Sequence, residues 1–512
     1  MPAPRPRRPR STPIAALADL LAAPGPGSDV AVTGVTLDSR AVLPGDLYAA
    51  LPGARAHGAD FTVAAVESGA VALLTDAPGA ARVADAGLDV PLVVVEDPRA
   101  VLGAVAARVY GTEHLDLRLV GITGTNGKTT TAHLVHSALT ALGRRAGLIG
   151  TVETRIGDER VASVRTTPEA PDLHALLAVM VERGLDTCVM EVSSHALAQH
   201  RVDGVVYDVA LFTNLSQDHL DFHDGMDDYF AAKASLFTPE RARTALVCTD
   251  DAWGRALVER AGVPVHTIGS ARDADWHVEV DGGDPSSFRL TAPGVDLHLR
   301  SSLPGDFNVT NTAMAAAALV LLGEDAGAVG EAVLADPHVP GRMESVAAPA
   351  GVAAPRAVVD YAHTPDAIRA ALRALRPTTP GLLVCVTGAG GDRDRDKRAA
   401  MGAAAGEVAD LVVVTDDNPR SEDPAAIRAA LLEGVAEVRG RGRTVSVAEV
   451  GDRREAIREA VRAAWPDGPD ATVAVVGKGH ESGQDVGGVV HPFDDRHELA
   501  EALRLEAGKA TA

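Results

Sequence analysis

Short runs of valine, leucine and alanine recur along the chain, and each is followed by a glycine-rich or polar turn and then by an amphipathic stretch. This alternation predicts repeated strand–loop–helix units, and therefore an α/β fold with mostly parallel sheets. Ligands of such sheets bind beyond the carboxyl ends of the strands, so we expect the chemistry of the chain in the loops that follow them. The clearest predicted strands are 117–122, 187–192, 205–211, 382–387, 411–415 and 472–476.

The chain has 512 residues, which are too many for one hydrophobic core and suit about three domains of roughly 150 residues each. One break near 110–115 precedes a strong nucleotide motif, and a proline-, alanine- and glycine-rich stretch at 340–355 is typical of a linker. The basic first residues indicate a disordered leader over 1–12, followed by a short helix. The predicted domains are 1–112, 113–345 and 346–512.

The composition limits the classes of partner. Lysine and arginine number 48 against 70 aspartate and glutamate, and the net charge of −22 argues against bulk-charge binding to nucleic acid or anionic lipid. Aromatic residues make up 3%, which leaves few stacking platforms for single-stranded nucleic acid. No apolar run reaches the roughly 20 residues that span a bilayer. The three cysteines are far apart and form no CxxC pair, which favours a reducing, cytoplasmic environment.

The sharpest motif is Gly-Ile-Thr-Gly-Thr-Asn-Gly-Lys-Thr-Thr at 121–130, between a predicted strand and a predicted helix. Glycines there let backbone N–H groups wrap phosphate oxygens, and the helix N-terminus adds a favourable dipole. Lys128 is then placed to reach the β- and γ-phosphates, and the Thr129 hydroxyl to bind Mg²⁺. Ile122 stands where the strict P-loop pattern has its first glycine, so the motif is a variant that predicts an ATP site.

Two side chains beyond later strands are candidate metal ligands. Glu191 ends an apolar strand, as a Walker-B acid does, and is interpreted as a Mg²⁺ ligand directly or through water. His219 lies in Asn-Leu-Ser-Gln-Asp-His-Leu-Asp at 214–221 and is a candidate ligand or a support for one. The aspartates of that motif are equally well interpreted as helix caps. His195 is interpreted as a packed or hydrogen-bonding histidine.

Lys233 shares one predicted helix face with Phe230, Ala234 and Phe237. A lysine on an apolar face usually extends its ammonium to solvent, and the sequence alone favours that interpretation. The alternative is a desolvated lysine with a lowered pKa, whose neutral amine takes up CO₂ as a carbamate and becomes a carboxylate-like metal ligand.

Three loops of the last domain bring complementary charges to one predicted sheet edge: 388–393, 417–420 and 477–481. Two arginines, an acid and an amide together are what a zwitterionic amino acid requires, since guanidinium pairs with carboxylate and carboxylate with ammonium. No Ser-His-Asp or Cys-His grouping for nucleophilic catalysis is evident in the sequence.

The combination of these motifs resembles the Mur ligases of cytoplasmic peptidoglycan synthesis. The resemblance covers nearly the whole chain and includes Gly-Arg-Met-Glu at 341–344; folylpolyglutamate synthetases share the central motifs. It implies a UDP-binding N-terminal α/β domain, a central P-loop-type domain with a mostly parallel sheet, and a Rossmann-like C-terminal α/β domain. It also implies Mg²⁺ held by Thr129, Glu191, His219 and a carbamylated Lys233, which reverses the preference for an extended lysine.

The resemblance implies binding residues for three substrates. For ATP they are Gly124, Thr125, Asn126, Gly127, Lys128, Thr129, Thr130, Asn308, Arg342 and Asp360. For a UDP-sugar-peptide they are Leu37, Ser39, Arg55, Ala56, His57, Thr166, Thr167, Ser193, Gln199 and Arg201. For diaminopimelate they are Arg393, Asp417, Asn418, Pro419, Arg420, Gly477 and Glu481. Many relatives have asparagine before the threonine pair where this chain has Arg165, so that contact is not carried over.

The implied activity is ATP-dependent addition of diaminopimelate to UDP-N-acetylmuramoyl-dipeptide through an acyl phosphate, by a cytoplasmic monomer. Two alternatives remain at this point: another Mur-type or folate-polyglutamate ligase, and a P-loop NTPase that acts as a motor or nucleic-acid switch. The sequence does not distinguish meso- from LL-diaminopimelate.

Overall fold

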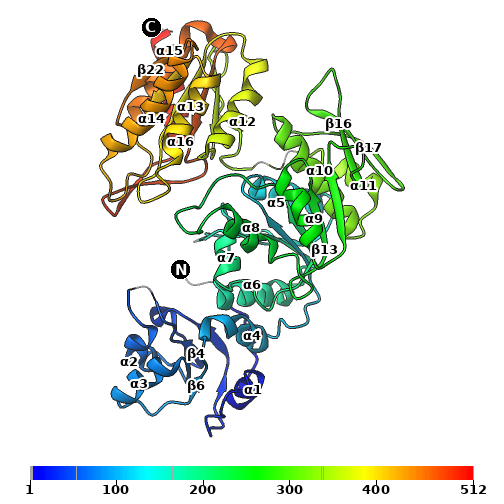
Figure 1. Cartoon of the computed structure of the whole chain (residues 1–512), viewed down its shortest axis with the longest axis vertical. Coiled ribbons are helices and arrows are strands. Elements are labelled where there is room, and N and C mark those ends of the chain that lie inside the picture. The colour runs from blue at the N-terminus through cyan, green and yellow to red at the C-terminus, as the bar shows by residue number, and fades with distance from the viewer. Residues whose placement is uncertain (1–3, 54, 164, 336, 338, 511–512) are drawn as a thin grey trace.

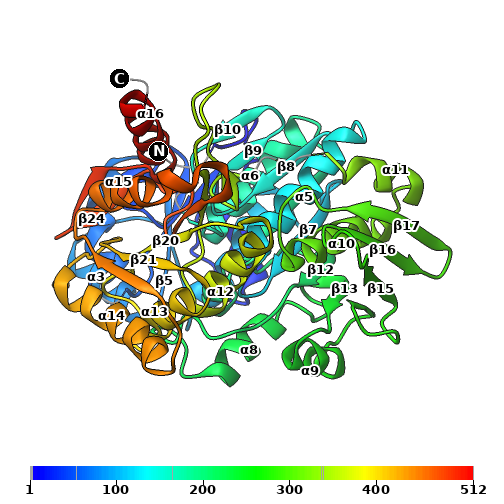
Figure 2. The ribbon, with the colours of Figure 1, turned by 90° about the horizontal axis from the view of Figure 1, so that it is seen from above.

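The computed structural model describes residues 4–53, 55–163, 165–335, 337 and 339–510. Figure 1 shows three sheet-containing units in a row along the long axis, with the N-terminal unit at one end and the C-terminal unit at the other. Figure 2, from above, shows most C-terminal elements at the left, in front of the blue N-terminal elements, with the strands β7, β12, β13 and β15 to β17 of the central unit to their right. The fold class is α/β with a central, mostly parallel sheet, as predicted.

The N-terminal unit is a four-stranded parallel sheet in the order β3-β4-β5-β6, with its helices packed around it. Helix α4, which leads out of this unit, begins where Asp97 accepts hydrogen bonds from the N–H groups of Arg99 and Ala100, and ends at Gly111 with a left-handed φ of 67°. The strands are β3 Gly34–Thr36, β4 Asp46–Ala49, β5 Ala72–Thr75 and β6 Leu92–Val94, and a separate pair is β1 Thr12–Pro13 and β2 Ala31–Val32. The helices are α1 Ile14–Leu20, α2 Thr62–Glu67, α3 Ala77–Asp85 and α4 Pro98–Tyr110, with 3₁₀ turns Ser39–Ala41 and Gly58–Phe61.

The first residues differ from the predicted disordered leader. Residues 1–3 lie outside the described part, but Arg5 forms an ion pair with the buried Asp46. The backbone N–H groups of Arg7 and Arg8 donate to Glu182 of the central unit. The leader is therefore ordered by carboxylates from two units, which lie far from it in sequence.

The central unit is an eleven-stranded sheet in the order β10-β9-β8-β11-β7-β12-β13-β14-β15-β16-β17. Strands β8 to β15 in that order run parallel, and the outer strands are antiparallel. The strands are β7 Arg118–Thr123, β8 Ala146–Ile149, β9 Thr154–Ile156, β10 Glu159–Val161, β11 Thr187–Glu191, β12 Tyr207–Phe212, β13 Ala242–Cys248, β14 Val265–Gly269, β15 Trp276–Val280, β16 Ser287–Ala292 and β17 Val295–Arg300. The helices are α5 Lys128–Ala141, α6 Ala170–Glu182, α7 Ser194–Ala198, α8 Met226–Ala234, α9 Ala252–Arg260, α10 Asp306–Leu321 and α11 Ala326–Ala332.

The C-terminal unit is a six-stranded sheet in the order β18-β19-β23-β20-β21-β22, parallel except for β18. The strands are β18 Glu344–Ser345, β19 Arg356–Asp360, β20 Leu383–Thr387, β21 Leu411–Val414, β22 Ser446–Glu449 and β23 Thr472–Val476, and a hairpin adds β24 Gly483–Val486 and β25 Val489–Pro492. The helices are α12 Pro365–Leu375, α13 Lys397–Val408, α14 Pro424–Gly440, α15 Arg453–Ala464 and α16 Asp495–Ala510, with 3₁₀ turns Arg376–Thr378 and Trp465–Asp470.

Strand order determines which loops meet. β7 lies between β11 and β12, so the 121–130 loop meets the ends of the strands that carry Glu191 and the 214–221 motif. β20 lies between β23 and β21, so the three amino-acid loops also meet. All six predicted strands are present within about two residues at their ends. In the described part of the chain, no helix is both long and apolar enough to cross a bilayer.

Candidate active site

The 121–130 loop is closed on itself between β7 and α5. Nζ of Lys128 donates to the carbonyl oxygens of Gly124 (2.7 Å) and Thr125 (2.8 Å). Gly124 has a φ of 144°, and a Cβ there would lie 1.9 Å from the Thr213 hydroxyl, so only glycine fits. Burial lowers the pKa of Lys128, although Glu191 and Asp218 oppose this effect. The Lys128 ammonium group is thus held against the backbone of the loop, where a phosphate would lie.

Glu191 faces the start of α5, as its Walker-B interpretation requires. Its Oε2 accepts hydrogen bonds from the hydroxyl groups of Thr129 (2.9 Å) and Thr151 (3.0 Å). The Thr129 hydroxyl also accepts from Nη2 of Arg342 (3.0 Å), whose guanidinium lies 4.4 Å from the Tyr361 ring centre. An arginine from the 340–355 segment therefore reaches the P-loop, and this segment is more structured than a plain linker.

Lys233 is buried and does not extend to solvent, which corrects the interpretation favoured by the sequence alone. Its side chain is about 1% exposed, and Nζ donates to the Gly124 carbonyl (2.8 Å) and lies 4.5 Å from the Tyr229 ring centre. Burial, reinforced by the nearby Lys128 charge, lowers the pKa of Lys233 well below its ordinary value. A lysine in this setting is suited to lose its proton and react with CO₂.

His219 has a left-handed φ of 56° and lies beside Asp218, with Nε2 3.5 Å from Oδ2 of that aspartate. Burial lowers the pKa of His219 to about 3, so the ring is neutral and able to act as a ligand. Among the described residues, no three histidine, cysteine, aspartate or glutamate side chains converge as a metal site. The expected set includes a lysine carbamate, so Mg²⁺ binding stays a prediction.

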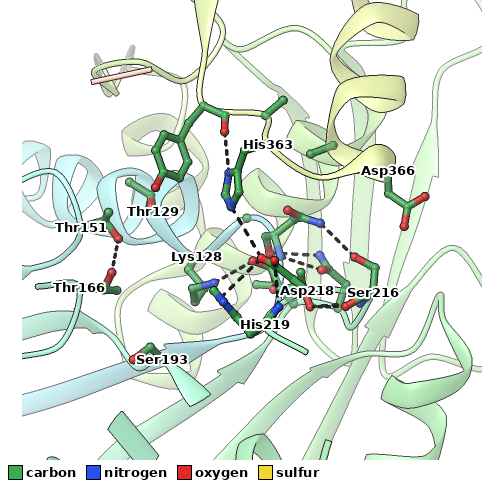
Figure 3. A pocket seen from close by; sticks show the side chains of 18 of the residues that line it. Lys128, Thr129, Thr151, Thr166, Ser193, Ser216, Asp218, His219, His363 and Asp366 are labelled. Carbon is green, nitrogen blue, oxygen red and sulfur yellow. Dashed lines mark hydrogen bonds and ion pairs between the residues drawn. The ribbon is translucent and has the colours of Figure 1, made fainter. Parts of the chain in front are cut away.

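Asp218 and Asp221 do not cap helices, because the next helix, α8, begins at Met226 with Gly225 as its N-cap and has no side-chain cap. Instead, Asp218 faces the C-terminal unit, 3.1 Å from Nζ of Lys397 and 3.7 Å from Nε2 of His363. Figure 3 shows His363 reaching down to Asp218 above Lys128 and His219. Burial opposes ionisation, but the three basic groups around Asp218 hold the pKa of its carboxyl well below its usual range.

The structure does contain one Ser-His-Asp arrangement, which sequence reasoning missed because its members are 29 and 5 residues apart. Nε2 of His223 lies 3.0 Å from the Ser194 hydroxyl, and Nδ1 lies 2.9 Å from Asp228. Ser194 is about 1% exposed, which leaves its hydroxyl no room to attack a substrate. The arrangement joins the 214–225 loop to α7. His195 packs on Phe222 with ring centres 4.1 Å apart, as its packed interpretation predicted.

The residues expected to hold the UDP-sugar-peptide fall into two groups. Thr167 donates to the Glu191 carbonyl (2.9 Å), and the hydroxyl oxygen of Thr166 lies 3.0 Å from that of Thr151, which itself contacts Glu191. Arg201 is held by Glu169 (2.9 Å) and Gln199 (2.5 Å). The other group lies in the N-terminal unit: Leu37, Ser39, Arg55, Ala56 and His57.

The amino-acid loop 417–420 is built around a group that sequence reasoning did not single out, the buried Lys478. Its Nζ donates to Asn418 Oδ1 (2.9 Å) and Glu481 Oε2 (3.1 Å), and Asn418 Nδ2 donates to the same Glu481 oxygen (2.9 Å). Arg420 has a left-handed φ of 49° and donates from Nη1 to the Gly391 carbonyl (2.6 Å). Arg393 lies 3.6 Å from Asp221 of the central unit.

One cavity of about 890 Å³ brings most of these residues together. Its lining includes the P-loop from Thr125 to Thr130, Arg342 and Asp360, and parts of the two other expected sites. From the sugar-peptide set it includes Thr166, Thr167, Ser193 and Arg201, and from the amino-acid set Arg393, Asp417, Asn418, Arg420, Gly477 and Glu481. Expected residues outside the lining are Gly124, Gln199, Pro419 and the five of the N-terminal unit.

Comparisons with known proteins agree with this architecture. The Mur ligase middle domain matches residues 122–319, the Mur ligase glutamate ligase domain matches 341–479, and the Mur ligase family catalytic domain matches 31–110. The chain belongs to the Mur ligase family, and the resemblance found in the sequence is confirmed.

Within the family, the chain is 54% identical to the UDP-N-acetylmuramoyl-L-alanyl-D-glutamate–2,6-diaminopimelate ligase of Streptomyces avermitilis, over 99% of both chains. It is 53% identical to the enzyme of the same name from Streptomyces coelicolor, again over 99% of both. A solved structure of a ligase with that name is 31% identical, with a TM-score of 0.63 over 93% of this chain and 96% of the other.

Proposed function

We propose that the protein joins 2,6-diaminopimelate to UDP-N-acetylmuramoyl-L-alanyl-D-glutamate with cleavage of ATP to ADP and phosphate. One observation carries this proposal: the P-loop, the threonine pair 166–167 and the 417–420 loop line a single cavity. A ligase needs its nucleotide, acid and amine within reach of one another. The names of the two Streptomyces relatives support the same pair of substrates.

ATP occupies the P-loop side of the cavity in this proposal. Lys128 turns from the Gly124 and Thr125 carbonyls to the phosphates, and the N–H groups at the start of α5 face the same oxygens. Asn308 and Asn311 of α10 support the first turn of α5, which follows the loop. Asn311 contacts both Asn308 (3.1 Å) and Thr131 of α5 (3.3 Å).

Arg342 and Asp360 form the C-terminal side of the nucleotide site. The carboxylate of Asp360 accepts from the N–H groups of Met343 (2.7 Å) and Ala362 (2.8 Å), which fixes the turn that carries Arg342. Because Arg342 comes from the segment that joins the central and C-terminal units, bound ATP would draw the two units together.

The donor set around Thr129 fits Mg²⁺, which prefers oxygen ligands. Glu191 and Thr129 are already in contact, and the buried Lys233 is suited to carry a carbamate oxygen pair, with His219 completing the set. When bound, Mg²⁺ would neutralise negative charge on the phosphates.

The reaction conserves atoms in two steps. A free side-chain carboxylate oxygen of D-glutamate attacks the γ-phosphorus of ATP, the bond to the β–γ bridging oxygen breaks, and an acyl phosphate and ADP form. The unprotonated amine of diaminopimelate then attacks the acyl carbon, the tetrahedral intermediate expels phosphate as the amide forms, and the proton that the amine nitrogen loses passes to the released phosphate or to solvent. The chain's contribution is positioning and charge stabilisation: Lys128, Arg342 and the P-loop N–H groups surround the transferring group.

The 417–420 loop reads the amino acid in this proposal. Arg420 and Arg393 supply guanidinium groups for carboxylates, and Glu481 and Asp417 supply carboxylates for an ammonium group. A lysine substrate lacks the distal carboxylate and would leave an arginine without its partner.

The decisive assay follows ATP turnover with UDP-N-acetylmuramoyl-L-alanyl-D-glutamate and, in turn, meso-diaminopimelate, LL-diaminopimelate and L-lysine. We expect turnover only when both acid and amine are present, with one diaminopimelate isomer strongly preferred. Turnover with a folate substrate and glutamate would instead support a folylpolyglutamate synthetase, and stimulation by nucleic acid would support a motor. The proposal includes a cytoplasmic, monomeric enzyme; light scattering at assay concentration tests the monomer.

A further inference from the structure

Lys478 is an unusual buried charge in the C-terminal unit, because its side chain is completely inaccessible to solvent yet no step of the proposed reaction uses it. Its Nζ has three oxygen partners: Asn418 Oδ1 at 2.9 Å, Glu481 Oε2 at 3.1 Å and Asp417 Oδ1 at 3.4 Å. All three partners line the cavity, whereas Lys478 does not. A buried ammonium with satisfied partners is costly to remove from its network.

The contacts of Lys478 fix which way the Asn418 amide points. The amide oxygen accepts from Lys478 and from the N–H of Asp485 (3.0 Å), both of which can only donate. The amide nitrogen is therefore directed at Glu481 Oε2, 2.9 Å away. Reversing the amide would set its NH₂ against two donors, so only one orientation is compatible with the lysine.

Glu481 is oriented by the same lysine. Its Oε2 accepts from both Lys478 and Asn418. Within the described part of the chain, no donor contacts Oε1, and the side chain is about one third exposed to the cavity. The network therefore uses one carboxylate oxygen of a cavity-lining side chain and leaves the other available to a ligand ammonium group.

The hairpin β24–β25 completes the frame. Gln484 Nε2 donates to the Asp417 carbonyl (2.8 Å), and the N–H of Arg420 donates to the Asp485 carbonyl (3.0 Å). The N–H of Gly487 in turn donates to the Arg420 carbonyl (2.7 Å). These bonds hold the main chain of the 417–420 loop in the left-handed turn at Arg420, while Lys478 holds its side chains.

We propose that Lys478 is a positioning residue for the amino-acid substrate: it orients Asn418 and, together with it, presents Glu481 to the ligand's ammonium group without touching the ligand. This inference rests on the proposed function for the identity of the amino acid. The role differs from a general structural one, because it predicts a selective loss of amino-acid binding.

The test compares the full-length protein with its Lys478→Met variant. Methionine has a side chain of similar length to lysine but carries no charge. The matched control is Lys509→Met, at the exposed end of α16 in the same unit. We expect Lys478→Met to raise KM for diaminopimelate about 10- to 100-fold, the equivalent of leaving buried polar groups without a partner. KM for ATP and for the UDP-substrate should change by less than about twofold, since none of the three oxygen partners of Lys478 belongs to the residues expected to bind those substrates.

A second measurement tests the route of the effect. In an Asn418→Ala background, Lys478→Met should raise KM for the amino acid much less than it does in the wild type, because the oriented amide is already gone. Equal effects in both backgrounds, an unchanged KM for the amino acid, or a uniform rise of all three KM values would each overturn the proposal.

If Lys478→Met does not fold, Lys478→Gln replaces it, because glutamine keeps an uncharged donor toward Asn418; a smaller rise in KM for the amino acid is then expected. Failure of both variants to fold would assign Lys478 a purely structural role and overturn the proposal. If the wild type uses an amino acid other than diaminopimelate, the proposed function fails, and the Lys478 inference is judged on KM for that amino acid.

Discussion

Nζ of Lys397 lies 3.1 Å from Oδ1 of Asp218, and this ion pair joins the unit that carries the amino-acid loops to the unit that carries the P-loop. The two side chains are only 11% and 6% exposed, so salt screens the pair weakly. Lys397 is the first residue of α13, and the dipole of that helix further favours a carboxylate at its start. One carboxylate therefore contributes to the placement of the C-terminal unit.

Replacing Lys397 should weaken that placement. Lys397→Met leaves Asp218 buried without its closest cationic partner, which typically costs about 2–5 kcal/mol at an interface. We expect a lower kcat and a broader distribution of distances between dyes attached to the central and C-terminal units. Lys509→Met serves as the control. An unchanged distance distribution would show that Lys397 acts on substrate alone.

Lys128→Ala should abolish ligation while the protein still folds. Removing a preorganised group that stabilises developing charge typically costs about 10²–10³ in kcat. The two carbonyls that Lys128 contacts, at Gly124 and Thr125, lose a charged donor, so unfolding stability should fall by roughly 1–3 kcal/mol. Steady-state kinetics and chemical denaturation measure the two effects. Near-normal turnover would remove the P-loop lysine from the mechanism.

Lys233→Ala should be nearly inactive and partly rescued by added acetate or formate. The motivation is a buried amine with a lowered pKa that donates to the Gly124 carbonyl of the P-loop. A short carboxylate placed in the vacated space would supply the missing ligand oxygens. Lys128→Ala is the matched comparison, because it lacks a different group and should gain nothing. Mass spectrometry of the native wild type checks the modification independently. A carbamate should increase the mass at Lys233 by about 44 Da, the mass of CO₂.

Stability should fall as the pH drops from about 6.5 toward 4, in part because of His174. Its Nε2 must donate to the Asp203 carbonyl (3.0 Å), so Nδ1 accepts from the Thr112 hydroxyl (2.6 Å) and the ring is neutral. Burial lowers the pKa of His174 to about 4, whereas the unfolded chain keeps about 6.5. The unfolded state therefore binds the proton first as pH falls, and it gains up to about 3 kcal/mol relative to the fold.

Denaturation at pH 7.5 and pH 5 measures this effect. His174→Gln should lose part of the difference between the two values, whereas His298→Gln, on the exposed face of β17, should keep it. Equal pH dependence in wild type and His174→Gln would assign the loss of stability to other groups.

The sequence predicted the strands and the P-loop because their signals are local. Apolar runs such as 472–476 and the glycine spacing of 121–130 each determine a short stretch of backbone, and the structure places both where they were expected. The family resemblance extended this to the whole architecture. Strand order then follows from packing, and it explains why motifs 70 residues apart share one sheet edge.

What the sequence did not predict depends on contacts between distant segments. Asp218 and Lys397 are 179 residues apart, and nothing in the 214–221 motif indicates a partner in another unit. The burial of Lys233 requires the Gly124 carbonyl, 109 residues earlier, to supply an acceptor. Lys478 was visible in the sequence between Gly477 and Glu481, but its role became clear only when its partners were known.

Arg420→Ala should convert a selective amino-acid site into a poor, unselective one. Arg420 uses Nη1 on the Gly391 carbonyl, and within the described part of the chain Nη2 has no acceptor, so it remains for a ligand carboxylate. Losing one partner of a buried charge pair typically costs about 2–5 kcal/mol. KM for diaminopimelate should therefore rise steeply, KM for ATP should change little, and the ratio of kcat/KM between diaminopimelate and lysine should fall.

The control is Arg395→Ala, which should keep the wild-type ratio. The exposed side chain of Arg395 pairs with Glu422. An unchanged ratio in Arg420→Ala would mean that the 417–420 loop supports the site but does not read the distal carboxylate.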